Sequence, residues 1–187
     1  MGKVYERIDD RLRDWLLSQP VVFVATAPLA GDGHVNVSPK GGRGAVAVLD
    51  ETTVAYLDFT GSGVETIAHL RENGRITLMW CAFSGPPKIV RVHGRGSVVL
   101  PGSPRWPSLA RSFPGADDPR VRAVVVVVAE RISDSCGYGV PLLDLRADRD
   151  VLERWSAKKG PDGLSAYRRE KNAVSIDGLP GLEGPEQ

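Results

Sequence analysis

Residues 21–27 read Val21-Val22-Phe23-Val24-Ala25-Thr26-Ala27, a run in which β-branched side chains predominate. Such a run is typical of a strand, because branched side chains pack well on a pleated surface. A Gly-Asp-Gly turn at 31–33 and an alternating segment at 34–38 follow, and residues 46–49 and 52–59 continue the strand pattern. This part of the chain therefore predicts a meander of antiparallel strands.

The next part of the chain adds one helix and three more strands. The helix is predicted from residue 64, with apolar side chains at helical spacing, and it ends at Asn73-Gly74. Strands are predicted at 75–83, 89–100 and 121–132. Seven strands with one inserted helix favour a closed or partly open barrel. The lack of regular strand–helix alternation argues against a parallel sheet.

Two flanking segments complete the pattern. Residues 1–19 predict an amphipathic helix that Pro20 ends. Residues 148–171 are helical in pattern, with a break at Gly160-Pro161. We expect residues 1–187 to form one domain, with the N-terminal helix at 1–19, the barrel at 20–132, and a loop and C-terminal helical segment at 133–187.

The composition is that of an ordinary globular protein, with 42% hydrophobic and 25% charged residues. A formal net charge of +1 argues against nucleic-acid binding, which needs clustered basic residues. The longest apolar run, at 123–129, is far shorter than the roughly 20 residues that cross a membrane. The charged N-terminus has no signal-peptide core, so we expect a cytoplasmic protein in which Cys81 and Cys136 stay reduced.

Several motifs that carry chemistry in other proteins do not occur in this sequence. It has no dinucleotide-binding glycine fingerprint, no P-loop and no nucleophile elbow. Its three histidines, His34, His69 and His93, lack the spacing of paired metal ligands. We therefore predict no metal site, and the catalytic residues stay unassigned.

The turn at Thr60-Gly61-Ser62-Gly63 allows two interpretations. Glycines let a backbone approach a ligand closely, and the following helix presents free N–H groups, so the turn is a candidate anion site. Ser62 and Glu65 also have the spacing of a capping box, in which each side chain satisfies the backbone N–H of the other.

Two sets of cationic residues are also candidates. Lys40 follows Pro39, where the strand must stop or bulge, and its charge either points into a ligand site or is solvated. Arg91, His93 and Arg95 alternate along one strand and share a face. Inside a barrel they would need an anion, whereas on an exposed face or against a partner subunit they would not.

These pieces, in this order, resemble the pyridoxamine 5'-phosphate oxidase-like family of flavin-binding split barrels. The resemblance spans about residues 21–100, and it lies in their order and spacing rather than in one motif. The later segments at 134–141 and 171–180 resemble an uncharacterised branch of that family. The matching stretches lie at 21–26, 35–40, 54–60, 73–75, 76–79 and 91–96.

The resemblance implies a mainly β protein with flanking helices, an FMN-binding split β-barrel that acts as an oxidoreductase on an unidentified small molecule. It further implies a homodimer with two FMN sites at the subunit interface. The strand at 35–40 would lie along the flavin ring, the turn at 60–63 would hold the phosphate, and the partner subunit would add groups from the strand at 89–95. The cofactor-binding residues implied are Asn36, Val37, Ser38, Lys40, Thr60, Gly61, Ser62, Gly63, Thr66 and Arg91.

One departure from the family leaves the cofactor open. The family's oxidases carry an Arg-Lys pair in the first turn of the phosphate-side helix, where this chain has Glu65 and Thr66. FMN would then be held through Lys40 and backbone amides, or replaced by the deazaflavin F420 or haem. The alternatives are thus an F420-dependent reductase or a non-catalytic protein that binds flavin or haem.

Overall fold

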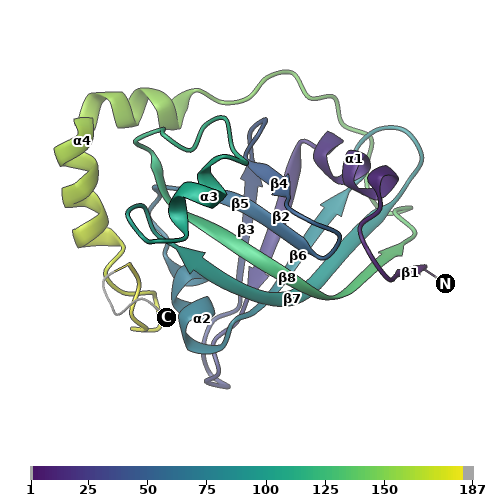
Figure 1. Cartoon of the computed structure of the whole chain (residues 1–187), viewed down its shortest axis with the longest axis horizontal. Helices are drawn as coiled ribbons and strands as arrows, with labels where there is room; N and C mark the ends of the chain where they lie inside the picture. The colour runs from purple at the N-terminus through teal and green to yellow at the C-terminus, as the bar shows by residue number, and fades with distance from the viewer. Residues whose placement is uncertain (1, 183–187) are drawn as a thin grey trace.

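The computed structural model describes residues 2–182, which form a curled antiparallel sheet with helices around it (Figure 1). The order in the eight-stranded sheet is β3-β2-β6-β7-β8-β5-β4, and β1 pairs with β8. The mainly β fold with flanking helices predicted from the sequence is confirmed. The strands are β1 (Val4–Tyr5), β2 (Val21–Thr26), β3 (Asn36–Gly41), β4 (Val46–Val48), β5 (Thr53–Phe59), β6 (Arg75–Cys81), β7 (Ile89–Val99) and β8 (Val121–Ser135). The helices are α1 (Asp10–Ser18), α2 (Glu65–Asn73), α3 (Trp106–Ala110) and α4 (Val151–Lys171).

The main core lies on the inner face of the curled sheet. Alternate residues of the strands turn inward, as a period of two requires. They include Tyr56, Leu78 and Trp80, which are almost fully buried. Helix α1 begins at its N-cap Asp9, whose carboxylate accepts from the Leu12 N–H at 2.8 Å, and it adds Leu12 and Leu16 to this core.

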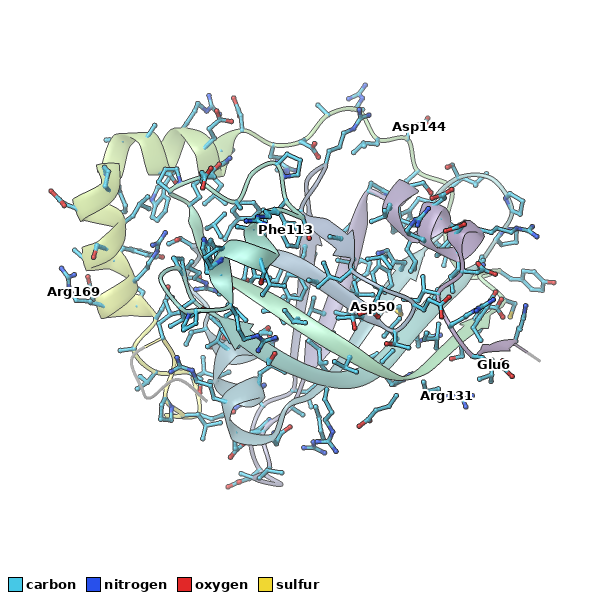
Figure 2. The ribbon with its side chains drawn as sticks, viewed as in Figure 1. Glu6, Asp50, Phe113, Arg131, Asp144 and Arg169 are labelled. Carbon is cyan, nitrogen blue, oxygen red and sulfur yellow. The ribbon has the colours of Figure 1, made fainter. Side chains whose placement is uncertain are left out.

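A second apolar cluster packs on the other face of β5 and β8. It includes Ala55, Val124 and Phe113, which is labelled beside α3 in Figure 2. Charged side chains such as Arg131 and Arg169 are exposed on the outside of the molecule (Figure 2). Strand β5 is thus buried on both faces, and any polar group on it must find a partner.

Helix α2 is the helix predicted between the strands, and it packs against β2, β6 and β7. It ends as the sequence predicts, at Gly74 in the left-handed conformation (φ 69°). The C-terminal helix α4 is broken at Gly160, with φ 66° and ψ 174°, so that predicted break is confirmed too. After α4 the chain runs through residues 172–182 beside α2 (Figure 1).

The sequence-based expectation that β3 stops or bulges at Pro39 is wrong. Strand β3 continues in register with β2 through Pro39, which pairs with Phe23, and ends at Gly41. The physical reason is that β3 is an edge strand, which pairs only with β2 among the described residues. A proline at an edge removes no ladder hydrogen bond when its nitrogen faces the open side.

Candidate functional site

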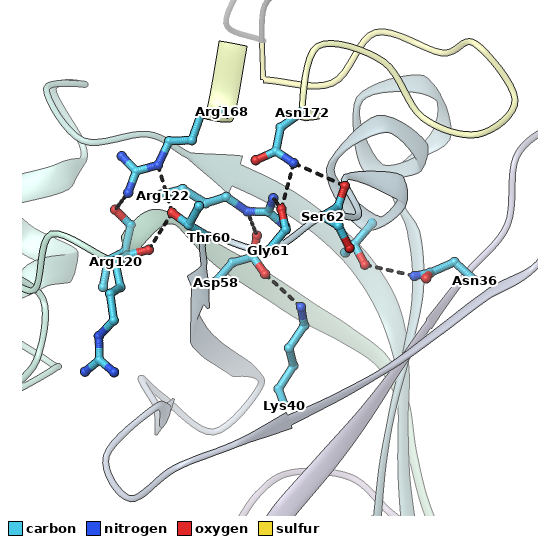
Figure 3. A network of polar contacts seen from close by, with 12 residues as sticks. Asn36, Lys40, Asp58, Thr60, Gly61, Ser62, Arg120, Arg122, Arg168 and Asn172 are labelled. Carbon is cyan, nitrogen blue, oxygen red and sulfur yellow. Dashed lines mark hydrogen bonds and ion pairs between the residues drawn. The ribbon is translucent and has the colours of Figure 1, made fainter. Parts of the chain in front are cut away.

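A buried carboxylate on β5 is the centre of the polar site (Figure 3). Asp58, whose side chain is 1% exposed, lies 2.8 Å from Lys40 Nζ on β3 and 2.7 Å from Arg122 Nε on β8. Burial opposes the ionisation of Asp58, but Lys40 and Arg122 outweigh it and lower the pKa of the carboxyl. Because β3 lies at one edge of the sheet and β5 near the other, the Lys40–Asp58 pair joins the two sides of the curl.

A third cation reaches the same region from α4. Arg168 donates from Nε to Thr60 Oγ1 at 2.8 Å and from Nη2 to the Pro119 carbonyl at 2.5 Å. Burial and the nearby charge of Arg122 lower the pKa of Arg168. Among the described residues, Lys40 and Arg122 share the carboxylate of Asp58 and Arg168 contacts no carboxylate, so the three cations leave two positive charges in excess. A half-buried excess of this kind favours an anion.

The turn at residues 60–63 lies against this cluster, and its two central carbonyls, those of Gly61 and Ser62, have partners. The Gly61 carbonyl accepts from Asn172 Nδ2 at 2.8 Å and from Arg122 Nη1 at 3.4 Å. The Ser62 carbonyl accepts from the same Asn172 amide at 3.5 Å. Within residues 2–182 the backbone N–H groups of Gly61, Ser62 and Gly63 donate to no protein atom. The turn therefore keeps three free donors.

The capping-box interpretation of Ser62 and Glu65 is wrong. The N-cap of α2 is Val64, which makes no side-chain capping bond, and Glu65 is the first helical residue rather than the third. Glu65 Oε1 instead accepts from the Ile176 N–H at 3.3 Å, so its carboxylate is occupied with the C-terminal segment. The helix begins too close to Glu65 for the reciprocal pair to form.

A second polar network joins β3 to α2. Ser38 Oγ donates to Asn36 Oδ1 at 3.1 Å, and Asn36 Nδ2 donates to Thr66 Oγ1 at 3.0 Å and to Thr26 Oγ1 at 3.2 Å. Thr26 Oγ1 lies 3.0 Å from His69 Nδ1. Burial lowers the pKa of His69, so the imidazole is neutral near pH 7. These bonds fix the inward side chains of β3 relative to the first turn of α2.

The structure brings most of the residues predicted for the cofactor together. From β3, Asn36 bonds to Thr66 and Ser38 bonds to Asn36. Lys40 points to Asp58, beside the turn at 60–63 (Figure 3). Val37 points the other way, with 62% of its surface exposed. Arg91 is separate from this group, because it lies on β7 and donates to Ser135 Oγ at 3.0 Å.

The burial of the side chains shows which way the candidate cations of β7 face and whether Lys40 is solvated. Arg91, His93 and Arg95 alternate with the buried Val90 and Val92, so they face away from the core. The cost of burying three cations in the barrel therefore does not arise. Lys40, in contrast, is not solvated, because its ammonium is paired with Asp58.

Sequence reasoning missed four residues of the site: Asp58, Arg122, Arg168 and Asn172. Asp58 is the one charged residue of β5, and Arg122 directly precedes the apolar run at 123–129 of β8, a pattern that indicates a buried ion pair. Arg168 and Asn172 lie in a polar helix end, where nothing in the sequence distinguishes them from solvated residues.

No group of three His, Cys, Asp or Glu side chains within residues 2–182 could hold a metal ion. Cys81 is buried, Cys136 is exposed, and both are free thiols. No helix in the same part of the chain is both long and apolar enough to cross a membrane.

A cleft of about 710 Å³ lies next to Lys40. Its walls come from the end of α1, the 41–44 turn, and the extended segment at 143–148. Trp80, Phe83 and Leu143 give it an apolar surface, and Lys40 and Asp148 add charges of both signs. Apolar walls with a few polar groups are the usual lining of a small-molecule site.

Comparison with known proteins gives one family. A family model described as pyridoxamine 5'-phosphate oxidase matches residues 8–136. The pyridoxamine 5'-phosphate oxidase family protein ustO of Aspergillus flavus is 42% identical over 194 residues, which cover 95% of this chain and 77% of that protein.

Solved structures show the same fold at low sequence identity. HupZ from Group A Streptococcus has a TM-score of 0.53 at 21% identity and covers 67% of this chain and 91% of its own. A protein from Clostridium acetobutylicum related to general stress protein 26 has a TM-score of 0.50 at 15% identity, covering 74% and 92%.

Proposed function

The chain belongs to the pyridoxamine 5'-phosphate oxidase family, and on that premise we propose that it binds a flavin-type cofactor, FMN in the first instance, and acts as an oxidoreductase. One observation carries the proposal. The turn at 60–63 presents three unpaired amides beside Lys40, Arg122 and Arg168, which hold two positive charges in excess. Backbone amides next to cations are the donor set that a phosphate requires.

The residues present fit such a cofactor. Gly61, Ser62 and Gly63 would hold the phosphate, and Thr60 and Thr66 flank it. Glu65, whose Oε1 accepts from the Ile176 N–H, keeps its negative charge beside Gly63, so the free amides and the cations must outweigh it. On β3, Asn36, Ser38 and Lys40 would line the ring and its side chain, and Val37, whose side chain points the other way, would contribute its backbone. When bound, a flavin supplies hydride or electron transfer, while the protein binds and orients it.

A second copy of the chain belongs to the proposal. Val35 and Val37 expose 71% and 62% of their surface along the β3 edge, and a partner subunit would cover them. The partner's β7 would then bring Arg91 to the cofactor. Sedimentation equilibrium should give twice the chain mass of 20.2 kDa, and a monomer at micromolar concentration would refute this part.

The deazaflavin F420 is the second candidate, and the first turn of α2 favours it. A phosphodiester, as in F420, carries one negative charge, whereas the phosphate monoester of FMN carries about 1.5–2 near pH 7. A helix start with Glu65 and Thr66 in place of two cations is better matched to the smaller charge. The residues of the 60–63 turn would serve both cofactors.

Titration of purified protein with FMN, F420 and haem tests the proposal. We expect FMN fluorescence to be quenched on binding with a micromolar or lower Kd, or F420 to bind in its place. A Soret band on adding haem, with no binding of either flavin, would replace the oxidoreductase by a haem-binding protein. If none of the three binds, the cofactor proposal is wrong.

A further inference from the structure

The C-terminal segment holds one side of the 60–63 turn. Asn172 is fully buried at the end of α4, and its side-chain amide donates to the carbonyls of Gly61 and Ser62. Its Oδ1 accepts no hydrogen bond among the described residues. A buried amide with an unused acceptor is costly, and here only the bonds to the turn offset that cost.

Arg168 contacts Thr60, the first residue of the same turn. Its Nε donates to Thr60 Oγ1, and that hydroxyl donates to the Arg120 carbonyl at 2.9 Å. The Thr60 N–H donates to the same carbonyl at 2.7 Å. Thr60 is therefore fixed by its backbone and its side chain together, and the turn that follows begins from a defined position.

We propose that Asn172, supported by Arg168, is a positioning residue that pre-forms the 60–63 turn for a phosphate group, an inference that rests on the proposed cofactor site. With its carbonyls bound from the C-terminal side, the turn directs its free amides away from them. Two glycines in four residues would otherwise leave the turn mobile, and the phosphate would have to order it on binding.

The positioning role concerns residues outside the part of the chain that the family model matches. The family model matches residues 8–136, so Asn172 and Arg168 both lie beyond it. The phosphate-side helix of this chain lacks side-chain cations in its first turn. The C-terminal segment compensates for these missing cations in two ways. It orders the 60–63 turn, and it places the positive charge of Arg168 next to Thr60.

The variant Asn172→Ala, with Asn73→Ala as the matched control, tests the role. Asn73 Nδ2 also holds a loop carbonyl, that of Ala27 at 2.9 Å, but at the other end of α2. Each titration uses FMN and riboflavin, which lacks the phosphate. We expect Asn172→Ala to raise the Kd for FMN about threefold to tenfold and to leave that for riboflavin unchanged. The control should change neither.

Backbone NMR relaxation gives a readout that needs no cofactor. The heteronuclear NOE of the Gly61, Ser62 and Gly63 amides should fall in Asn172→Ala, because the turn becomes more mobile, and not in Asn73→Ala. Unchanged relaxation, or an equal loss of affinity for FMN and riboflavin, would overturn the inference. If Asn172→Ala fails to fold, the same criteria apply to Arg168→Lys. Lysine keeps the positive charge but loses the paired hydrogen bonds of the guanidinium to Thr60 and Pro119.

A failure of the cofactor proposal can be distinguished from a failure of the positioning role of Asn172. Wild-type protein that binds none of FMN, F420 and haem would refute the proposed function, and inorganic phosphate would then decide the inference. Phosphate-induced shifts of the amide resonances of residues 61–63 that are lost in Asn172→Ala would retain the positioning role. No shift in the wild type would refute it.

Discussion

Replacing Lys40 by methionine tests whether the Lys40–Asp58 pair joins the two sides of the curled sheet. Methionine keeps the length and the apolar stem of lysine but loses the ammonium. The side chains of Lys40 and Asp58 are 19% and 1% exposed, so solvent screens the pair little. Breaking a buried pair costs about 3–5 kcal/mol when it leaves a charge uncompensated.

Here Arg122 still neutralises Asp58, at 2.7 Å, so the cost should be lower. We expect Lys40→Met to lower the free energy of unfolding by about 2–3 kcal/mol, the scale of one hydrogen bond to a charged group. For a chain of this size that corresponds to a loss of about 5–10 °C in Tm. Urea and thermal unfolding followed by circular dichroism measure both quantities.

Lys171→Met is the matched control. Lys171 Nζ also lies 2.8 Å from a carboxylate, that of Glu170, but the two side chains are 51% and 69% exposed. Exposed pairs contribute about 0–1 kcal/mol, so this variant should be almost as stable as the wild type. Equal effects of the two substitutions would show that Lys40 is solvated and that the pair does not hold the sheet.

Three further predictions concern the site and its surroundings. Because Lys40 and Arg122 hold the pKa of Asp58 in the folded state below its ordinary value, the carboxylate stabilises the fold fully above that ordinary value, and this contribution is lost as pH falls through the folded pKa. The stability difference between wild type and Asp58→Asn should therefore be constant from about pH 5 to 7 and shrink below about pH 4 in urea titrations; a difference that grows on acidification would contradict the sign. Glu65→Arg should lower the Kd for FMN about tenfold by adding a charge-assisted bond, while Glu65→Gln should change it less; an unchanged Kd in the arginine variant would place the phosphate elsewhere. Cys136 is exposed and should react with a thiol reagent within minutes, whereas burial raises the pKa of Cys81, which should react only on unfolding; equal rates would refute the burial assigned to Cys81.

Local patterns in the sequence predict most of the fold. The β-branched run at 21–27, the helical spacing after residue 64 and the breaks at Gly74 and Gly160 each depend on neighbours in the chain, and all of them are found. Pro39 was misjudged because its tolerance depends on the edge position of β3, which is a property of the whole sheet.

The candidate site could be predicted only in part, because its contacts join distant residues. The family resemblance implies that Asn36, Ser38 and Lys40 share a cofactor site with the 60–63 turn. Asp58 and Arg122 are 64 positions apart, and Asn172 is 111 positions from Gly61. No periodicity or local motif reports a contact over such a separation.

The central claim, that the 60–63 turn and its surplus cations hold the phosphate of a flavin-type cofactor, is tested most directly by comparing FMN with riboflavin on wild-type protein. The two ligands share the ring and differ in the phosphate. We predict that FMN binds at least tenfold more tightly and that the difference shrinks as salt is raised. Equal affinity for the two ligands, or no binding of either, would contradict the claim.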